Sequence, residues 1–254
     1  MNNAYEGAVV VVTGASTGLG RAIAVGAAQS GAQAVIVNYA NSAEQAHITA
    51  GLVRDAGAQA IIAQGDVGSS EDCARIVDAA RSFGRIDALF NNAGVSRAGA
   101  FDEFTDRDFL DVYRVNVVGA YQMAITARDL LEAGAGAIVN TSSLAGVAAK
   151  GSSLAYTVSK GALNTLGRAL ALDLAPKIRV NTICPGFIDT EWFDKNDPVG
   201  GVDALREHIR AASALKTISR AEDIADSALF LGSHAARHIT GQVLVVDAGM
   251  HLGG

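Results

Sequence analysis

Short apolar runs rich in β-branched residues alternate along the chain with longer segments whose apolar positions recur at helical spacing. The runs are nearly continuous in apolar residues, which is typical of parallel strands covered on both faces by helices. Those predicted as strands are 8–13, 33–38, 60–63, 87–90, 136–140, 179–183 and 242–246. The pattern therefore predicts an α/β fold, a single-domain Rossmann-type doubly wound parallel sheet of about seven strands.

Helix starts are indicated by a Ser or Thr followed three residues later by a polar or acidic residue, an arrangement that caps free backbone N–H groups. These candidate starts are Ser42, Ser69, Thr105 and Ser219. The stretch 187–216 interrupts the alternation, and an insertion after the carboxyl end of a strand lies over the ligand crevice of such a sheet. We therefore expect a substrate lid at about 187–216 within one domain of residues 1–254. Trp192 and Phe193 in it either contact substrate or pack on the lid itself.

A glycine-rich turn follows the first predicted strand directly, with the spacing G-x-x-x-G-x-G. Glycines at a strand-to-helix turn let the backbone approach a pyrophosphate, whose charge is met by the amides and the dipole of the following helix. The turn is therefore predicted to bind a dinucleotide through Gly14, Ser16, Thr17, Gly18, Leu19 and Gly20.

The second predicted strand ends at Asn38, where a carboxylate would bind both hydroxyls of an adenosine ribose. An acidic side chain there would repel a 2′-phosphate, so Asn38 with Tyr39 favours NADP (NADPH) over NAD. NAD is the alternative, because neither Thr17 nor Asn41 is the Arg or Lys that would clamp that phosphate.

Asp66 and Val67 follow the third predicted strand and are candidates to hold the adenine, although an Asp at this point is also common in a simple turn.

Tyr156 and Lys160 stand four residues apart, which places both side chains on one face of a helix. An ammonium beside a phenol favours the phenolate, so we expect the pKa of Tyr156 to be lowered and the phenol to act as an acid/base near neutral pH. Ser143, thirteen residues upstream, follows the fifth strand and can donate a hydrogen bond to a substrate oxygen. Ser142 beside it is the alternative.

Taken together, these elements resemble the short-chain dehydrogenase/reductase family, in its compact, non-extended branch, over nearly the whole chain. Its elements occur here in the family's order: the glycine turn, Asn91–Gly94, Asn116, Ser143, the Tyr156/Lys160 pair and Pro185–Gly186.

The resemblance implies an NAD(P)-dependent oxidoreductase that interconverts a ketone and a secondary alcohol by hydride transfer. It implies that Tyr156 is the general acid/base and that Ser143 orients the reacting oxygen. It further implies that Lys160 lowers the Tyr156 pKa and binds the nicotinamide ribose, while Asn116 holds a water that relays protons. The additional cofactor contacts that it implies are Asn92, Ala93, Gly94, Pro185, Gly186, Ile188 and Thr190.

The resemblance leaves the substrate open. A 3-oxoacyl-[acyl-carrier-protein] reductase, a sugar or polyol dehydrogenase and a hydroxysteroid dehydrogenase all fit the motifs. Against the first, acyl carrier protein is acidic, and 130–136 offers no Lys or Arg where relatives present a basic docking patch. A non-enzymatic NADP redox sensor is disfavoured because the proton-relay residues are intact. An epimerase of the extended branch would carry a longer C-terminal substrate domain.

Composition and net charge limit the classes of partner that we expect. The net charge of −6 without a basic run excludes nucleic acid and anionic membrane surfaces as expected partners. We expect neither a signal peptide nor a membrane span, hence a cytoplasmic protein, with Cys73 and Cys184 buried and reduced. His234 and His238 have no third ligand nearby, so we expect no metal. The helix predicted at 162–174 is apolar on more than one face, which with the family's habit suggests a homotetramer or homodimer.

Overall fold

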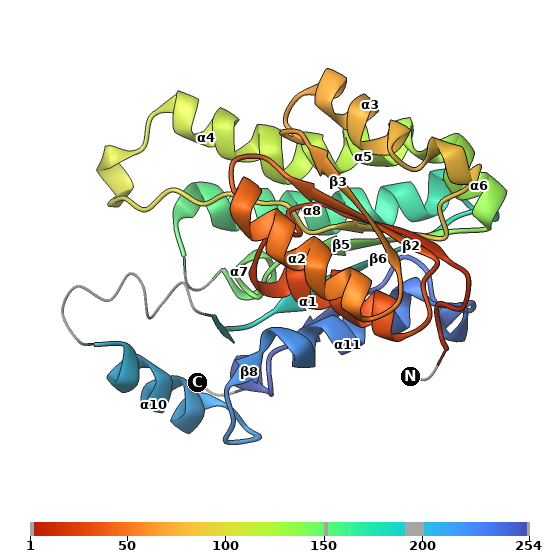
Figure 1. Ribbon diagram of the computed structural model, residues 1–254. Coiled ribbons are helices and arrows are strands. Elements are labelled where there is room, and N and C mark those ends of the chain that lie inside the picture. Colours follow the sequence, from red (N-terminus) through yellow and green to blue (C-terminus); the bar gives the residue numbers. More distant parts are fainter. Residues whose placement is uncertain (1–2, 150–151, 191–200, 253–254) are drawn as a thin grey trace.

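A seven-stranded parallel sheet forms the centre of the molecule, with helices on both faces (Figure 1). The computed structural model describes residues 3–149, 152–190 and 201–252. The strands lie in the order β3-β2-β1-β4-β5-β6-β9. Their bounds are β1 Val9–Val12, β2 Ala34–Tyr39, β3 Gln59–Gln64, β4 Ala88–Asn91, β5 Ala137–Thr141, β6 Arg179–Pro185 and β9 Val243–Val246. The predicted fold class is confirmed, and the seven predicted strands are all present.

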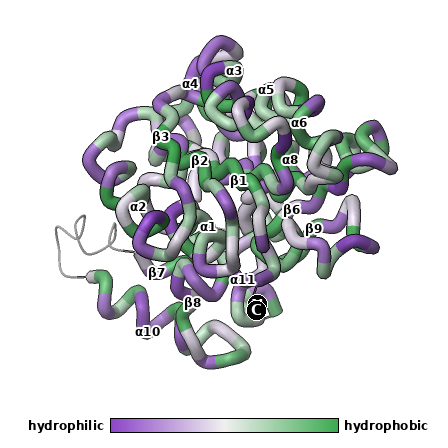
Figure 2. The backbone as a smooth tube through the Cα atoms, turned by 45° about the vertical axis from the view of Figure 1, so that its right-hand side comes forward, coloured by the Kyte–Doolittle hydropathy of each residue, from purple (hydrophilic) through white to green (hydrophobic). Residues whose placement is uncertain are grey.

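The central strand β1 packs against apolar side chains on both faces of the sheet. Its side chains alternate between two cores: Val10 and Val12 join one apolar cluster, while Val9 and Val11 join the other. All four are fully buried, so no polar residue is needed on either face. Figure 2 shows hydrophilic colour on outer helices such as α2 and hydrophobic colour on the central strands.

One face of the sheet is covered by α1 (Gly18–Gln29), α2 (Ala43–Asp55) and α11 (Ala221–Gly232). The other is covered by α3 (Ser70–Asp78), α5 (Gly119–Thr126), α6 (Arg128–Gly134) and α8 (Leu154–Asp173), with α4 (Asp106–Tyr113) packed against α8. Shorter elements are the single-turn helices η1 Arg81–Phe83, η2 Phe101–Glu103, η4 His234–Ala236 and η5 Met250–Leu252, the π-helical turn η3 Arg114–Val118, and α7 Ala145–Ala148.

The strand order reverses at β1, which pairs in parallel with both β2 and β4. At such a reversal the connections leave the sheet in opposite directions, so a crevice opens outside the carboxyl ends of the strands. The glycine turn that follows β1 is therefore placed at this crevice.

The predicted lid falls in a region that the structure describes in part. Its described parts are β7 (Ile188–Asp189), which pairs in parallel with β8 (Ser219–Arg220), and α10 (Val202–Ala212). Trp192 and Phe193 lie outside the described residues, and closure over a substrate stays a prediction.

Two of the four predicted helix caps are confirmed. The hydroxyls of Ser69 and Thr105 accept hydrogen bonds from the backbone N–H groups of Asp72 and Asp108. Ser42 precedes α2, but its side chain makes no capping hydrogen bond.

The cap predicted at Ser219 is wrong, because Ser219 is drawn into β8 by pairing with Ile188. The helix α11 starts two residues later, and the Asp223 carboxylate accepts a 2.7 Å hydrogen bond from the N–H of Arg220.

Both cysteines are buried and unpaired. Among the described residues, no helix is both long enough and apolar enough to cross a membrane.

Candidate active site

The glycine turn after β1 approaches the neighbouring backbone so closely that Gly14 and Gly20 leave no room for a Cβ atom. Gly14 and Gly18 have positive φ angles of 61° and 52°, a conformation that glycine adopts without strain. A Cβ atom on Gly20 would lie 2.6 Å from Nδ2 of Asn92 and closer still to the carbonyl oxygen of Gly14. Thr17 precedes α1 without a side-chain cap, so the first turn of this helix presents backbone N–H groups toward the crevice. These features form a cradle for an anion.

Two residues from neighbouring strands hold the turn in place. Asn92 donates 3.1 Å hydrogen bonds from Nδ2 to the carbonyl oxygens of Thr13 and Gly14. The hydroxyl oxygen of Thr13 accepts hydrogen bonds from the N–H groups of Asn92 and Ala93, at 2.9 and 3.0 Å. The Nδ2 group of Asn92 thus shapes the turn, and the contact with the cofactor that the sequence predicts for this residue stays a prediction. Thr13 is not among the predicted residues, although a single polar residue ending an all-valine strand was a signal for it.

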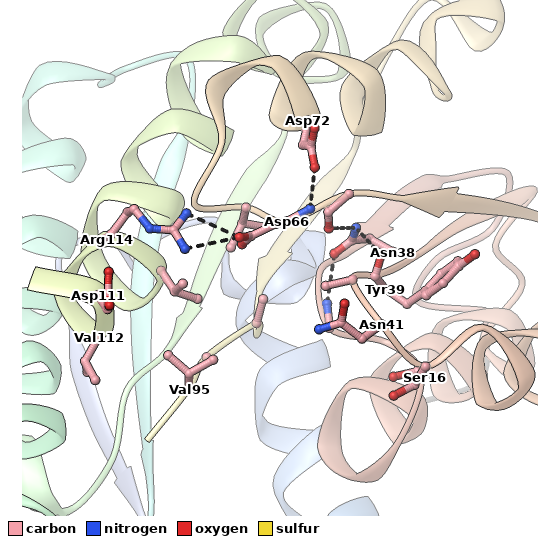
Figure 3. A pocket seen from close by; sticks show the side chains of 18 of the residues that line it. Ser16, Asn38, Tyr39, Asn41, Asp66, Asp72, Val95, Asp111, Val112 and Arg114 are labelled. Atoms are coloured by element: carbon pink, nitrogen blue, oxygen red, sulfur yellow. Dashed lines mark hydrogen bonds and ion pairs between the residues drawn. The ribbon is translucent and has the colours of Figure 1, made fainter. Parts of the chain in front are cut away.

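A cavity of about 1080 Å³ opens beside the turn, between the carboxyl ends of the strands and α4 (Figure 3). This volume is that of a pocket for a sizeable organic ligand. The predicted cofactor residues that line it are Gly14, Ser16, Asn38, Tyr39, Asp66, Val67, Ala93 and Gly94.

The Asn38 side chain is buried and engaged with the backbone. Its Oδ1 accepts a hydrogen bond from the N–H of Gly14 at 3.1 Å. Its Nδ2 donates to the carbonyl oxygens of Ala63 and Gly65, at 3.1 and 3.0 Å. Asn38 thus fixes the glycine turn to the end of β3, and Tyr39, Asn41 and Ser42 are the neighbours that line the cavity beside it.

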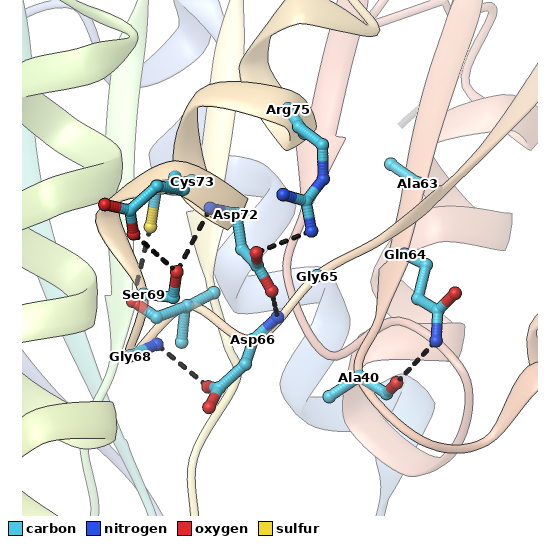
Figure 4. Close-up of polar contacts among 12 residues, drawn as sticks. Ala40, Ala63, Gln64, Gly65, Asp66, Gly68, Ser69, Asp72, Cys73 and Arg75 are labelled. Carbon is cyan, nitrogen blue, oxygen red and sulfur yellow. Dashed lines mark hydrogen bonds and ion pairs between the residues drawn. The ribbon is translucent and has the colours of Figure 1, made fainter.

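The Asp66 carboxylate lies at the cavity wall and is paired with an arginine (Figure 3). Its Oδ2 lies 3.2 Å from both terminal nitrogens of Arg114, and its Oδ1 accepts from the N–H of Gly68 at 2.9 Å. Asp72 accepts from the N–H of Asp66 at 2.8 Å and forms an ion pair with Arg75 (Figure 4). Each of these two carboxylates therefore has an arginine partner. Arg114 could not be singled out from the sequence, because nothing local links it to Asp66.

Ser143, Tyr156 and Lys160 meet at the carboxyl end of β5. Ser143 lies just beyond this strand and hydrogen-bonds the Tyr156 phenol, while Tyr156 and Lys160 project from α8. The Lys160 Nζ lies 5.4 Å from the centroid of the Tyr156 ring and donates a 2.8 Å hydrogen bond to the Thr141 carbonyl oxygen. Ser142 instead donates to the Lys160 carbonyl oxygen at 2.9 Å. The geometry thus places Ser143, and not Ser142, beside the phenol.

Burial is the largest cause of the pKa shifts of Tyr156 and Lys160. Burial lowers the pKa of Lys160 from 10.5 to about 8, because the ammonium is removed from water. Burial also raises the pKa of Tyr156, and the hydrogen bond from Ser143 opposes that shift only in part. The expectation that the Tyr156 pKa is lowered is therefore wrong for this structure, because desolvation of the phenolate outweighs the favourable contacts.

The Asn116 amide is fully engaged inside the protein. Its Oδ1 accepts from the N–H of Val95 at 2.8 Å, and its Nδ2 donates to the Val95 carbonyl oxygen and the Ser159 hydroxyl, both at 2.9 Å. A relay water would therefore need main-chain atoms of the π-helical turn η3, in which Asn116 lies. A Cβ on Gly94 would lie 3.4 Å from Lys160 Nζ and 3.3 Å from Asn116 Oδ1, so Gly94 keeps this junction compact.

Cys184 is a further residue at this site, beyond the packing role that its sequence position suggests. It is fully buried, and its thiol lies 3.5 Å from Oδ1 of Asn164. Burial raises the pKa of this thiol, so it stays protonated and apolar in character at neutral pH.

The residues after β6 close the crevice from the other side. Gly186 packs against Asp247, because a Cβ there would lie 2.6 Å from the Asp247 Cβ. Thr190 faces the glycine turn, with its Cγ2 3.7 Å from where a Cβ on Gly18 would stand. Pro185 ends β6, and Ile188 lies in β7 beside Thr190. Their contacts with a cofactor stay predictions. In the described part of the chain, no three His, Cys, Asp or Glu side chains are grouped as metal ligands would be.

Comparison with known proteins gives matches over nearly the whole chain. A family model described as enoyl-(acyl carrier protein) reductase matches residues 14–251. A protein of Streptomyces violaceoruber named as a ketoacyl reductase of the granaticin polyketide synthase is 37% identical over 255 residues, covering 98% of each chain. An L-rhamnose 1-dehydrogenase (NAD(P)(+)) of a Sphingomonas species is 36% identical over 251 residues, 97% of each chain. A crystal structure from Burkholderia xenovorans, described as a short-chain dehydrogenase/reductase, has a TM-score of 0.88 and 42% identity, covering 97% of this chain and 98% of its own.

Proposed function

Because the chain belongs to the short-chain dehydrogenase/reductase family of NAD(P)-dependent oxidoreductases, we propose that it interconverts a small-molecule ketone and a secondary alcohol, with NADPH as the preferred reductant. The observation that carries the proposal is the junction of Ser143, Tyr156 and Lys160 beside the glycine cradle. It combines a hydroxyl donor, a phenol and a buried amine at one end of a crevice that fits a dinucleotide.

The glycine turn fits the pyrophosphate of a dinucleotide, since Cβ atoms at Gly14 or Gly20 would clash with the surrounding backbone and fill the cradle. The first turn of α1 would hold the pyrophosphate, and the residues around Tyr39 and Asp66 would hold the adenosine. A bound NADPH supplies the hydride that reduces the carbonyl carbon.

In the proposed mechanism the Tyr156 phenol donates its proton to the carbonyl oxygen as an alkoxide charge develops there. Ser143 hydrogen-bonds the same oxygen and orients it. Lys160 lies under the phenol ring, where a positive charge stabilises the phenolate left after proton transfer. In the direction of alcohol oxidation, the phenolate takes the hydroxyl proton.

The preference for NADPH is supported by the charges around the adenosine end of the cavity. Tyr39, Asn41 and Ser42 line the wall after β2 and carry no carboxylate. The acidic groups Asp66 and Asp72 are each paired with an arginine. A 2′-phosphate at this wall would therefore meet no unpaired negative charge from these residues.

Initial rates of NADPH and NADH oxidation by the purified protein test the proposal, across ketones, keto-sugars, steroids and a carrier-free β-ketoacyl thioester. We expect turnover with at least one class, faster with NADPH than with NADH. The proposal would be contradicted if the protein bound the nucleotide but neither reduced any of these ketones nor oxidised any of the matching alcohols.

A ketoacyl thioester is included because a similar protein is named as a ketoacyl reductase. Recognition of a carrier protein is a weaker candidate. The nearby cations Arg128 and Lys177 share the Glu132 carboxylate, at 2.9 and 2.6 Å. Arg81 on the same edge pairs with both Asp78 and Asp129, at 3.2 and 3.3 Å. Three cations are thus matched by three carboxylates, and this group offers no uncompensated basic patch to an acidic carrier.

We also propose that the protein forms a homotetramer or a homodimer. Large apolar side chains are exposed along α4, α5 and α8: Leu110, Tyr113, Tyr121, Ile125 and Leu172. An apolar surface of this kind is typical of a contact between subunits. Light scattering coupled to size exclusion should give a mass that is a multiple of 26.0 kDa, and a monomer at micromolar concentration would contradict this assignment.

A further inference from the structure

A two-pronged ion pair joins α10 to β7. The Nε of Arg206 lies 3.2 and 3.0 Å from the two carboxylate oxygens of Asp189, and its Nη2 lies 2.9 Å from Oδ1. The two side chains retain only 23% and 28% of their exposure. A planar guanidinium facing a carboxylate in this way fixes orientation as well as distance, and partial burial reduces screening by solvent.

Asp189 is adjacent to a residue that faces the glycine turn, so a small displacement of Asp189 would change the position of that residue at the cradle. Asp189 lies between Ile188 and Thr190, and Thr190 faces Gly18 in the glycine turn. The strand β7 is only two residues long, and within the described residues it pairs only with β8, Ile188 with Ser219 and Asp189 with Arg220. So short a ladder gives little rigidity to the segment that closes the crevice.

The helix α10 does not fix β7 through an apolar core. None of its residues is buried, and Leu205 on it is 38% exposed. The segment after α10 is anchored separately, where Ser213 is buried and the N–H of Leu215 donates to the Ala248 carbonyl oxygen at 3.1 Å. The contact described between α10 and β7 is therefore polar: it is the forked ion pair between Arg206 and Asp189.

We propose that Arg206 is a positioning residue for the cofactor: through Asp189 it holds β7, and with it Thr190, against the glycine cradle. The inference rests on the proposed function, since it concerns the same nucleotide. Without the fork, β7 moves more freely, the arrangement in which Thr190 faces the cradle is less populated, and the nucleotide binds more weakly. The chemistry at Tyr156 is unaffected once the nucleotide is bound.

The test is a fluorescence titration of the full chain with NADPH, which needs no ketone. We expect Arg206→Ala to raise the dissociation constant about fivefold or more, and Arg206→Lys to recover part of the loss. Asp203→Ala is the matched control. Asp203 also contacts Arg206, at 3.3 Å, but is 96% exposed, so its loss should leave the affinity unchanged.

A double-mutant cycle separates the fork from other contacts of Arg206. If the pair acts as a unit, Asp189→Ala combined with Arg206→Ala should bind NADPH no more weakly than Arg206→Ala alone. In steady-state assays the KM for NADPH should rise with the dissociation constant, while kcat at saturating NADPH stays within about twofold of the wild type.

The possible outcomes separate the two proposals. Equal affinities of the wild type and Arg206→Ala, or fully additive losses in the cycle, would overturn the role of Arg206 while leaving the proposed function intact. If the wild type bound neither NADPH nor NADH, the proposed function and this inference would both be overturned.

Discussion

Lys160 lies beneath Tyr156, with its Nζ 5.4 Å from the centre of the phenol ring, and is almost wholly removed from solvent. The one hydrogen bond described for this amine goes to a backbone carbonyl oxygen, that of Thr141. Within the described residues, no carboxylate forms an ion pair with it. Burial without a carboxylate partner destabilises the charged form of this amine. The unfolding free energy of the protein therefore depends on pH through Lys160.

The first prediction concerns the pH dependence of stability. The Lys160 pKa is about 8 in the folded protein and 10.5 in the unfolded chain, so the unfolded chain binds more protons between these values. Stability from this group therefore rises with pH across that window. Relative to Lys160→Met, the wild type should gain about 2 kcal/mol of unfolding free energy between roughly pH 7 and pH 10.

Urea unfolding of both proteins at each pH measures this difference, and titrating groups remote from Lys160 cancel in the comparison. A difference that does not change with pH, or that changes in the opposite sense, would show that Lys160 is not desolvated as the structure indicates.

The second prediction concerns Asn38. Asn38→Asp would place a carboxylate oxygen against the carbonyl oxygens of Ala63 and Gly65 in place of a donor. We expect a loss of about 2–4 kcal/mol of unfolding free energy and weaker binding of both nucleotides, because the glycine turn loses its support. Cofactor preference should not switch to NADH.

Asn41→Asp is the matched variant for Asn38→Asp, since Asn41 is exposed and lines the cavity. It should leave stability within about 0.5 kcal/mol of the wild type and weaken NADPH binding more than NADH binding. Paired denaturation curves and nucleotide titrations decide the matter. A clean switch to NADH in Asn38→Asp without loss of stability would refute the role given to this residue.

The third prediction contrasts two glycines. A Cβ on Gly20 would strike Gly14 and Asn92, so Gly20→Ala should abolish detectable NADPH binding and lower stability. Gly51 lies within α2, and a Cβ added there would meet nothing within 4 Å in the described part of the chain. Gly51→Ala should therefore raise the unfolding free energy by about 0.5–1 kcal/mol. Thermal melts and nucleotide titrations distinguish the two. Normal binding by Gly20→Ala would mean that the cradle is looser than described.

The fold could be predicted from the sequence because strands buried on both faces are almost continuously apolar, as in Val9–Val12. The residues of the site could be named because the motifs fall at strand ends, where topology brings them together. What could not be predicted was the state of each side chain. The side chains of Asn38 and Asn116 are hydrogen-bonded within the protein, and burial raises the pKa of Tyr156. Both depend on long-range packing.

The Arg114–Asp66 and Arg206–Asp189 pairs could not be foreseen for a similar reason. Their partners are 48 and 17 residues apart, and no periodicity links a loop after one strand to a helix elsewhere in the chain. The helix start at Ala221 was displaced because pairing between Ile188 and Ser219 took precedence over a local capping pattern.

In the proposed reaction the Tyr156 phenol transfers the proton to the ketone oxygen. NADPH oxidation by the wild type, Tyr156→Phe and Tyr121→Phe is to be compared, using the ketone that the wild type reduces fastest. Tyr121 is an exposed residue of α5, so its variant should behave as the wild type. Tyr156→Phe should lose about 10³-fold in kcat while binding NADPH with an affinity within about twofold of the wild type. A Tyr156→Phe variant that kept a substantial fraction of the wild-type rate would contradict the assignment of the phenol as general acid.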